Sequence, residues 1–107
     1  MTTTTGKGLS AIDYTLRLAG ALRRHCLSHA LHDVLAAVAK LETTDGHATI
    51  PGVALRLGCT FQAVTLHVYR NPGLFRVSEN AVPRQVRLSQ ESVDLLARIK
   101  ERTHSHE

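Results

Sequence analysis

Caps and helix breakers divide the middle of the chain into segments that are long enough only for small helices. Thr49 can cap a helix that has Pro51 in its first turn, where the missing N–H group costs nothing. Gly58 is a suitable end for that helix, and Thr60 can cap the next one. Residues 71–73 are Asn-Pro-Gly, which ends a helix firmly. The pattern predicts two short consecutive helices, over residues 49–57 and 61–70.

Longer helices are predicted before this region. A helical pattern of apolar residues begins near Ser10, and a second one covers about residues 28–42. Residues 43–46, Thr-Thr-Asp-Gly, then form a clear break. Ser28 can cap the second helix, but one long helix could equally run through it. The pattern therefore leaves open whether a turn separates the first two helices.

Strand signals follow the two short helices. Residues 74–77 and 85–88 are rich in β-formers, and the turn-forming stretch between them predicts a hairpin with a long tip. Ser89 can cap a final helix, on which Val93, Leu96 and Ile99 share one apolar face. The expected fold class is mostly α with a small β-hairpin.

The length of 107 residues allows one domain, which we place at residues 9–103. Residues 1–8 and 104–107 are expected to be tails, the first of them disordered, because they offer little to bury.

Neither a secretory signal nor an apolar run of about 18 residues is present, so no membrane partner is expected. Two cysteines without a CxxC pair fit a cytoplasmic protein with reduced thiols. A domain this small is only marginally stable alone, which favours dimerisation.

Positive charge is concentrated in the middle of the chain. The formal net charge is +4, and residues 49–88 alone carry five arginines against one acid, Glu79, which gives +4 there. Residues 1–48 contribute +1 and residues 89–107 contribute −1. A basic segment within a near-neutral chain is typical of proteins that bind nucleic acid.

Residues 50–70 resemble a helix-turn-helix unit. Ala54 lies where the first helix of such a unit needs a small side chain, so that the second helix can cross it closely. On the second helix, the side expected to pack inward consists of Phe61, Val64 and Val68. The side expected to point outward consists of Gln62, Leu66, Tyr69 and Arg70, with Ala63 at its edge.

In such a unit the second helix enters the major groove, and its first residues meet base edges and phosphates. Gln pairs well with adenine and Arg with guanine or phosphate, and a Thr hydroxyl can hold a phosphate oxygen. The hairpin that follows would be the wing, and Arg84 lies nearest its tip, beyond Arg76 and Arg87. The residues expected to contact double-stranded DNA are Thr60, Gln62, Ala63, Thr65, Leu66, Arg70, Arg76 and Arg84.

Over about residues 28–102 the whole arrangement resembles the MarR-type winged helix-turn-helix regulators. The matching pieces are Val53-Ala54, Leu57-Gly58, Val64-Thr65, Gly73-Leu74-Phe75 and Val86-Arg87-Leu88-Ser89. The resemblance implies a repressor-like transcriptional regulator. It also implies a homodimer, with its first and last helices intertwined, that binds a pseudo-palindromic operator. Members of this family are often controlled by a small-molecule effector.

The chain departs from the family pattern at three places. Residues 80–82 are Asn-Ala-Val where the family usually has Asp-x-Arg at the wing, and Leu66 stands where the family often has Arg. The link after the second helix is also shorter, with Asn-Pro-Gly in place of its final turn. These departures bear most on contact between the wing and the minor groove.

Other interpretations of the same residues stay open. Winged helices also serve as protein-interaction modules, and the outward Leu66 fits such a role. His25, His29 and His32 would lie near one another on an unbroken helix and could bind a metal in a metal-sensing regulator, although no ligand motif is present. Cys59 is expected to be a small buried residue of the turn. No catalytic motif or cofactor loop is found, so neither an enzyme nor a cofactor is expected.

Overall fold

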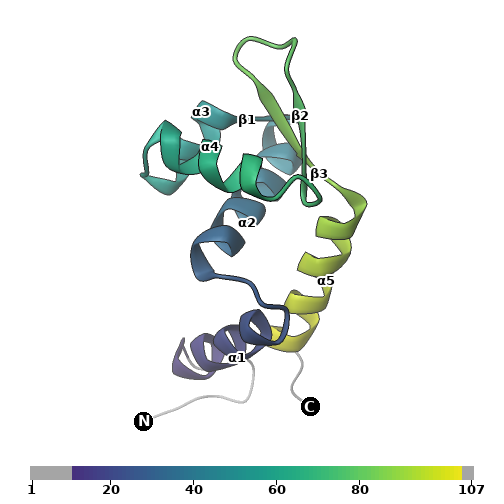
Figure 1. Ribbon diagram of the computed structural model, residues 1–107. Coiled ribbons are helices and arrows are strands. Elements are labelled where there is room, and N and C mark those ends of the chain that lie inside the picture. Colours follow the sequence, from purple (N-terminus) through teal and green to yellow (C-terminus); the bar gives the residue numbers. More distant parts are fainter. Residues whose placement is uncertain (1–10, 105–107) are drawn as a thin grey trace.

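The computed structural model of the chain describes residues 11–104, which form five helices and a small antiparallel sheet (Figure 1). The segment expected to be a tail, residues 1–8, lies outside the described residues, as do residues 105–107. In chain order the elements are α1 (Ala11–Arg24), α2 (His29–Asp45), β1 (Ala48–Thr49), α3 (Ile50–Leu57), α4 (Phe61–Arg70), β2 (Phe75–Ser78), β3 (Gln85–Leu88) and α5 (Gln90–His104).

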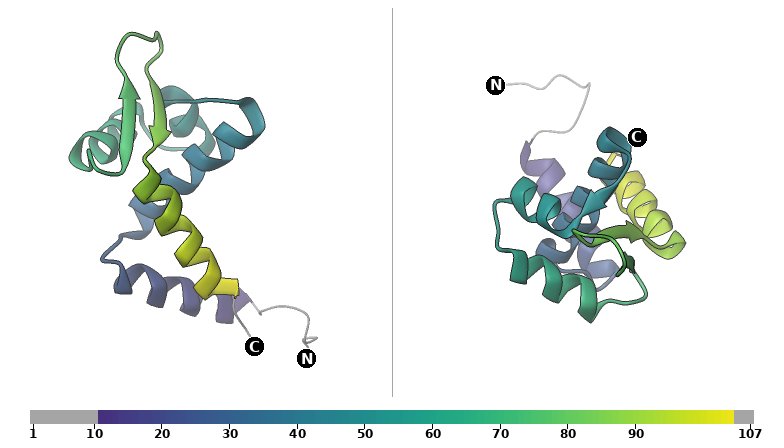
Figure 2. Two further views of the ribbon diagram at one scale, coloured as in Figure 1. Left: turned by 90° about the vertical axis from the view of Figure 1, so that its right-hand side faces the viewer. Right: turned by 90° about the horizontal axis from the view of Figure 1, so that it is seen from above.

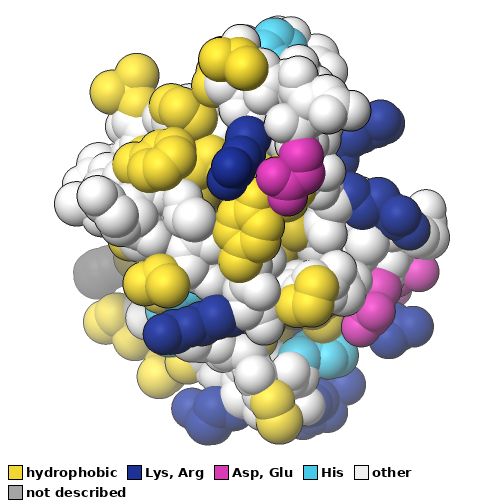
Figure 3. Space-filling view, turned by 45° about the horizontal axis from the view of Figure 1, so that its top comes forward, with side chains coloured by type: hydrophobic (Ala, Val, Ile, Leu, Met, Phe, Trp, Pro, Cys, Tyr) yellow, Lys and Arg dark blue, Asp and Glu magenta, His cyan; other side chains and the backbone are white. Residues whose placement is uncertain are grey.

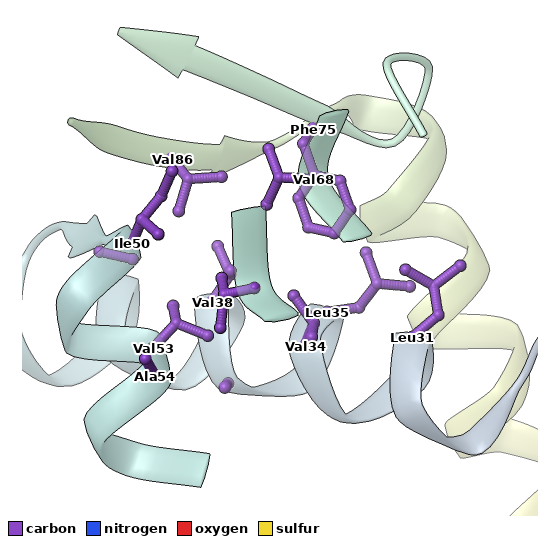
Figure 4. Packing of buried hydrophobic residues seen from close by; sticks show 13 residues of the cluster. Leu31, Val34, Leu35, Val38, Ile50, Val53, Ala54, Val68, Phe75 and Val86 are labelled. Carbon is purple, nitrogen blue, oxygen red and sulfur yellow. The ribbon is translucent and has the colours of Figure 1, made fainter. Parts of the chain in front are cut away.

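The main core lies between α2, the short helices and the sheet (Figure 4). The side chains of α2 recur at helical spacing and meet apolar side chains from α3, α4 and both hairpin strands. Each large side chain buried here contributes about 1.5–3 kcal/mol to folding. The core residues labelled in Figure 4 are Leu31, Val34, Leu35, Val38, Ile50, Val53, Ala54, Val68, Phe75 and Val86.

The two short helices begin and end at the residues that the sequence predicts. The Thr49 hydroxyl accepts a hydrogen bond from the Gly52 N–H group at 3.0 Å. The Thr60 hydroxyl accepts one from the Ala63 N–H group at 3.1 Å. Gly58 ends α3 in the left-handed region, with φ at 69°, which a residue without Cβ adopts at no steric cost. Local chemistry therefore sets both helices.

A turn separates α1 from α2, which settles the alternative left open by the sequence. Cys26 has a positive φ of 55°, and the Leu27 N–H group donates to the Leu22 carbonyl at 2.8 Å. Ser28 then caps α2 by accepting from the Leu31 N–H group. At its other end α2 continues to Asp45, three residues beyond the predicted end, before Gly46 stops it.

The hairpin is confirmed, but it belongs to a sheet of three strands in the order β1-β3-β2. Strand β3 pairs antiparallel with β2, with Val77 opposite Val86, and also with β1, with Ala48 opposite Val86. Strand β1 has only two residues and precedes α3 directly, so it has no recognisable alternation in the sequence. Its pairing attaches the start of α3 to the half of β3 that adjoins the tip of the hairpin.

Helix α5 leads from the sheet to α1, as the left view of Figure 2 shows. Its buried side contains Ser92 and Ile99, whereas Val93 is exposed, so the prediction that Val93 shares the inward face was wrong. The reason is that the Ser92 hydroxyl donates to the Leu74 carbonyl at 2.6 Å, which turns that face of the helix toward the body. The helix ends at His104, at the start of the segment expected to be a tail.

Helix α1 packs on α5 and forms a second, smaller apolar cluster of Ala21, Leu22 and Ile99. We call residues 11–24 and 97–104 the arm, and residues 29–96 the body. The described chain is elongated, 52 × 24 × 22 Å, with the hairpin at one end and α1 near the other (Figure 1). The first turns of α1 leave Ile12 and Leu16 largely exposed.

Candidate nucleic-acid interface

Helix α4 presents one side to the core and the other to the exterior. Val64 and Val68 are fully buried against α2 and α3, which anchors the helix. The outward side is as the sequence predicts, with exposed Gln62, Leu66, Tyr69 and Arg70, and half-buried Ala63 and Thr65. Five of the six residues proposed on the helix-turn-helix unit therefore lie on α4 itself, and the sixth, Thr60, is its cap.

Phe61 is an exception, because 49% of its surface is exposed although the sequence predicts an inward side chain. It is the first residue of α4, and the buried side of the helix begins one turn later, at Val64. Helical spacing gives the direction of a side chain, but it does not say whether another element covers it. Phe61 therefore adds apolar surface beside the proposed binding face.

The two threonines of this region use their hydroxyl groups differently. Thr60 accepts from the Ala63 N–H group, so its own proton remains available to a phosphate oxygen. Thr65 donates to the Phe61 carbonyl at 2.9 Å, so its proton is used within the helix. Thr65 can thus offer a methyl group and an acceptor, but not a donor, in this rotamer.

Arg76 and Arg87 of the wing lie opposite each other in the strand register, and both are exposed. Arg87 is turned toward α2, where its Nε lies 3.7 Å from the Glu42 carboxylate. Among the described residues no ion pair is formed by Arg56, Arg70 or Arg76, which leaves these three cations for an external anion.

Arg84 does not extend freely toward an external ligand. Its Nη1 donates to the Tyr69 hydroxyl at 3.2 Å, and its Nε lies 3.6 Å from the Glu79 carboxylate. The tip also carries Val82, an apolar residue that is 97% exposed. Figure 3 shows the same mixed character across this face, where apolar side chains lie exposed between a few basic ones.

The three histidines do not share one helix. His25 lies in the turn after α1, whereas His29 and His32 are on α2. Residues 11–104 contain no group of three His, Cys, Asp or Glu side chains that could hold a metal ion. Burial lowers the pKa of His32, opposed by the Asp33 carboxylate and reinforced by His29.

Both cysteines are exposed free thiols. The prediction of a buried Cys59 was wrong, because the turn between α3 and α4 projects this residue away from the core. Cys26 likewise lies in a turn and not within a helix. Apolar neighbours in the sequence do not bury a residue that sits between two elements.

A cavity of about 480 Å³ lies between α1, α2 and α5. Its walls are mostly apolar and include Leu18 and Ile99, and His32, Lys40 and Lys100 also line it. It is separate from the exposed side of α4. Within residues 11–104, no helix is long and apolar enough to cross a membrane.

Comparison with known proteins gives matches of structure only. No family model and no curated protein matches the chain. A transcriptional regulator from Thermotoga maritima has a TM-score of 0.69 at 17% identity, over 86% of this chain and 65% of its own. A MarR family protein from Bacillus stearothermophilus has a TM-score of 0.70 at 15% identity, over 87% of this chain and 65% of its own. The chain thus spans about 65% of the length of these two proteins.

A third match is similar in size to this chain. It is the solution structure of a homodimeric winged helix-turn-helix DNA-binding domain from Mycobacterium bovis, a possible ArsR-family regulator. Its TM-score is 0.53 at 16% identity, over 100% of this chain and 99% of its own. Identities this low show a shared fold. Helices α3 and α4, followed by the β2–β3 hairpin, therefore make this chain a winged helix-turn-helix protein.

Proposed function

We propose that the chain is a repressor-like transcriptional regulator that binds double-stranded DNA with α4 in the major groove. The observation that carries this proposal is the outward side of α4, where Gln62 and Arg70 are exposed while Val64 and Val68 fix the helix to the core. A rigid helix with polar side chains directed outward is what reading of base edges requires. Such a regulator would act in the cytoplasm.

Each residue has a chemical role in this proposal. Thr60 and the start of α4 hold a phosphate, and Gln62 pairs with adenine. Arg70 binds guanine or phosphate, and Arg76 binds the backbone beside the groove. Apolar contacts with thymine methyl groups fall to Leu66, together with Ala63 and the methyl group of Thr65.

The salt dependence of binding tests the proposal. Affinity for duplex DNA should fall steeply between ~50 and ~200 mM salt, because each phosphate contact releases counterions. Replacing both Gln62→Ala and Arg70→Ala should remove sequence preference without unfolding the chain. Lys40→Ala, which changes an exposed basic residue on α2 outside both the helix-turn-helix unit and the arm, is the control and should leave binding unchanged. Absence of binding at low salt, or an affinity independent of salt, would contradict the proposal.

We also propose that two copies associate through the arm. Ile12 is 72% exposed and Leu16 is 65% exposed, one turn apart on α1, which is unusual for apolar residues of a stable monomer. The Mycobacterium bovis domain is a homodimer, which agrees with this assembly.

A small-molecule effector would have the cavity between α1, α2 and α5 available, at the junction of arm and body. A thermal shift on adding a candidate effector would test that part.

A protein-interaction module is the second candidate. It is favoured by the apolar side chains exposed on the helix-turn-helix unit, namely Leu55, Phe61 and Leu66. Such a module would bind a partner through these residues with little dependence on salt. The DNA titration separates the two candidates, since only the regulator loses affinity as phosphate contacts are screened.

A further inference from the structure

Three side chains connect the wing to the end of α4. The Tyr69 hydroxyl donates to the Glu79 carboxylate at 3.1 Å and accepts from Arg84 Nη1 at 3.2 Å. Arg84 Nε also lies 3.6 Å from Glu79, and its guanidinium is 6.0 Å from the centre of the Tyr69 ring. The contacts form a closed triangle, which we call the wing clamp (Tyr69, Glu79 and Arg84).

The positions of these residues in the chain let the wing clamp hold both ends of the tip. Glu79 directly follows the last residue of β2, and Arg84 directly precedes the first residue of β3. The tip, residues 79–84, is therefore held at both of its ends by one side chain of α4. An exposed ion pair alone contributes little. A closed set that uses both the donor and the acceptor of a hydroxyl fixes geometry more strongly than a single pair.

The wing clamp also changes the charge that the wing presents. Glu79 is the single acidic residue of residues 49–88, and it lies against the arginine nearest the tip. The pair is close to neutral, so it adds little attraction for phosphate. The basic residue of the wing that has no ion pair among the described residues is Arg76, on the opposite strand.

We propose that Arg84 and Glu79 are positioning residues, which hold the wing at a fixed distance and angle from α4 through Tyr69. This inference rests on the proposed DNA binding, and it removes Arg84 from the direct phosphate contacts. Arg84 acts on DNA through the placement of the wing, while Arg76 supplies the wing's charge. A DNA duplex has fixed groove dimensions, so a wing of fixed position suits it better than a mobile one.

The wing clamp can be tested first without DNA. The chain has two tyrosines and no tryptophan, so a Tyr14→Phe background leaves Tyr69 as the sole emitter. A tyrosine hydroxyl bonded to a carboxylate is quenched, and Glu79→Gln should therefore raise the emission. The Ala81 amide, which donates to the Ser78 carbonyl at 3.4 Å, should exchange faster in the same variant. Glu101→Gln, on α5, is the matched control. Unchanged emission together with unchanged exchange in Glu79→Gln would overturn the wing clamp.

The second test uses a duplex selected for binding to the wild-type chain. Arg84→Ala should lower the affinity for this duplex by about twofold to tenfold, the worth of one or two hydrogen bonds. It should not change the salt slope, which is the slope of log affinity against log salt concentration. Tyr69→Phe should lower the affinity by a similar factor. The double variant Tyr69→Phe, Arg84→Ala should lose no more affinity than either single variant. Arg76→Ala, on the same hairpin, should reduce the slope by about 0.9.

The outcomes separate this inference from the proposed function. A reduction of the slope by about 0.9 in Arg84→Ala would assign that residue to a phosphate and overturn the positioning role, while DNA binding would stand. Additive losses in the Tyr69→Phe and Arg84→Ala pair would also overturn it. Absence of DNA binding at low salt would reject the proposed function, and the emission and exchange measurements would still decide whether the wing clamp forms.

Discussion

Leu66 lies at the centre of the outward side of α4, one turn after Gln62 and one turn before Arg70, with 51% of its surface exposed. An apolar side chain at this place has one apolar group to meet in the major groove, the methyl group of thymine. We expect the preferred operator to contain a thymine at this position. Replacing that thymine by uracil should weaken binding by about threefold to tenfold, roughly the worth of one buried methyl group. A fluorescence anisotropy titration would measure this loss.

The variant Leu66→Ala provides the internal check on this expectation. It should bind the thymine and uracil duplexes almost equally, because the partner of the methyl group is gone. Leu55→Ala, which removes an exposed leucine from α3, should keep the full discrimination. A Leu66→Ala chain that still prefers thymine would show that another residue contacts the methyl group.

His32 is the residue whose protonation should affect stability. Its Nδ1 is buried without a hydrogen-bond partner, and burial holds the pKa below the ordinary value of 6.5. The unfolded chain therefore binds a proton at a higher pH than the folded chain does. The free energy of unfolding should be largest above pH 6.5, fall as the pH decreases toward the lowered folded pKa, and level off below it.

Urea unfolding at several values between about pH 5 and 8 would measure this dependence. His32→Gln should flatten the curve in that window. His47→Gln changes an exposed histidine and serves as the control. A curve that keeps its slope in the His32→Gln variant would assign the pH dependence to another group.

At the scale of the elements, the sequence was most informative where structure is local. The caps Thr49 and Thr60 and the stop at Gly58 depend on neighbours within four residues, so they could be predicted. Strand β1 could not, because its pairing with β3 joins residues far apart in the chain. Phe61 and Val93 were expected inward because periodicity gives direction without showing what covers a side chain.

The candidate site likewise has a part that local sequence predicts and a part that depends on distant residues. The outward residues of α4 follow from helical spacing once the caps are known. The role of Arg84 does not, because its partners Tyr69 and Glu79 come from two different elements. Position near the tip made Arg84 look available to DNA, and only the folded arrangement gives it partners within the protein.

Gly58 gives a direct test of how the α3–α4 turn is held. Its φ of 69° is unfavourable for a residue with a Cβ, although no neighbouring atom lies where that Cβ would be. Gly58→Ala should therefore lower the free energy of unfolding by about 1 kcal/mol through backbone strain alone. Gly58→Asn should cost less, since Asn tolerates this region. Equal stabilities of the wild-type and Gly58→Ala chains would show that the turn relaxes to another conformation.

At the scale of the whole molecule, the body and the arm have separate apolar clusters, and they differ in size. The arm has three buried apolar residues, Ala21, Leu22 and Ile99, and the exposed turns of α1 extend beyond them. A small cluster at the end of an elongated chain is poorly stabilised by itself. Burial against a second copy would protect it.

We therefore expect a chain with Ile12→Lys and Leu16→Lys to lose self-association. Because the proposed dimer would bury both side chains, two lysines in their place should weaken it by about 100-fold or more. The body should keep its own unfolding transition, because its core contains neither residue. Sedimentation equilibrium would measure the mass, with Leu55→Lys as the control for an exposed leucine outside the arm. A double variant with the wild-type mass would place the interface elsewhere.

The two exposed thiols give this chain built-in attachment points for spectroscopic labels. Cys26 sits in the turn between α1 and α2, where the arm joins the body, and Cys59 sits beside the start of α4. Nitroxides on both would allow the distance between the joint and the helix-turn-helix unit to be followed by dipolar spectroscopy, with no cysteine introduced or removed. The same exposure leaves both thiols accessible to oxidants, so purification calls for a reductant.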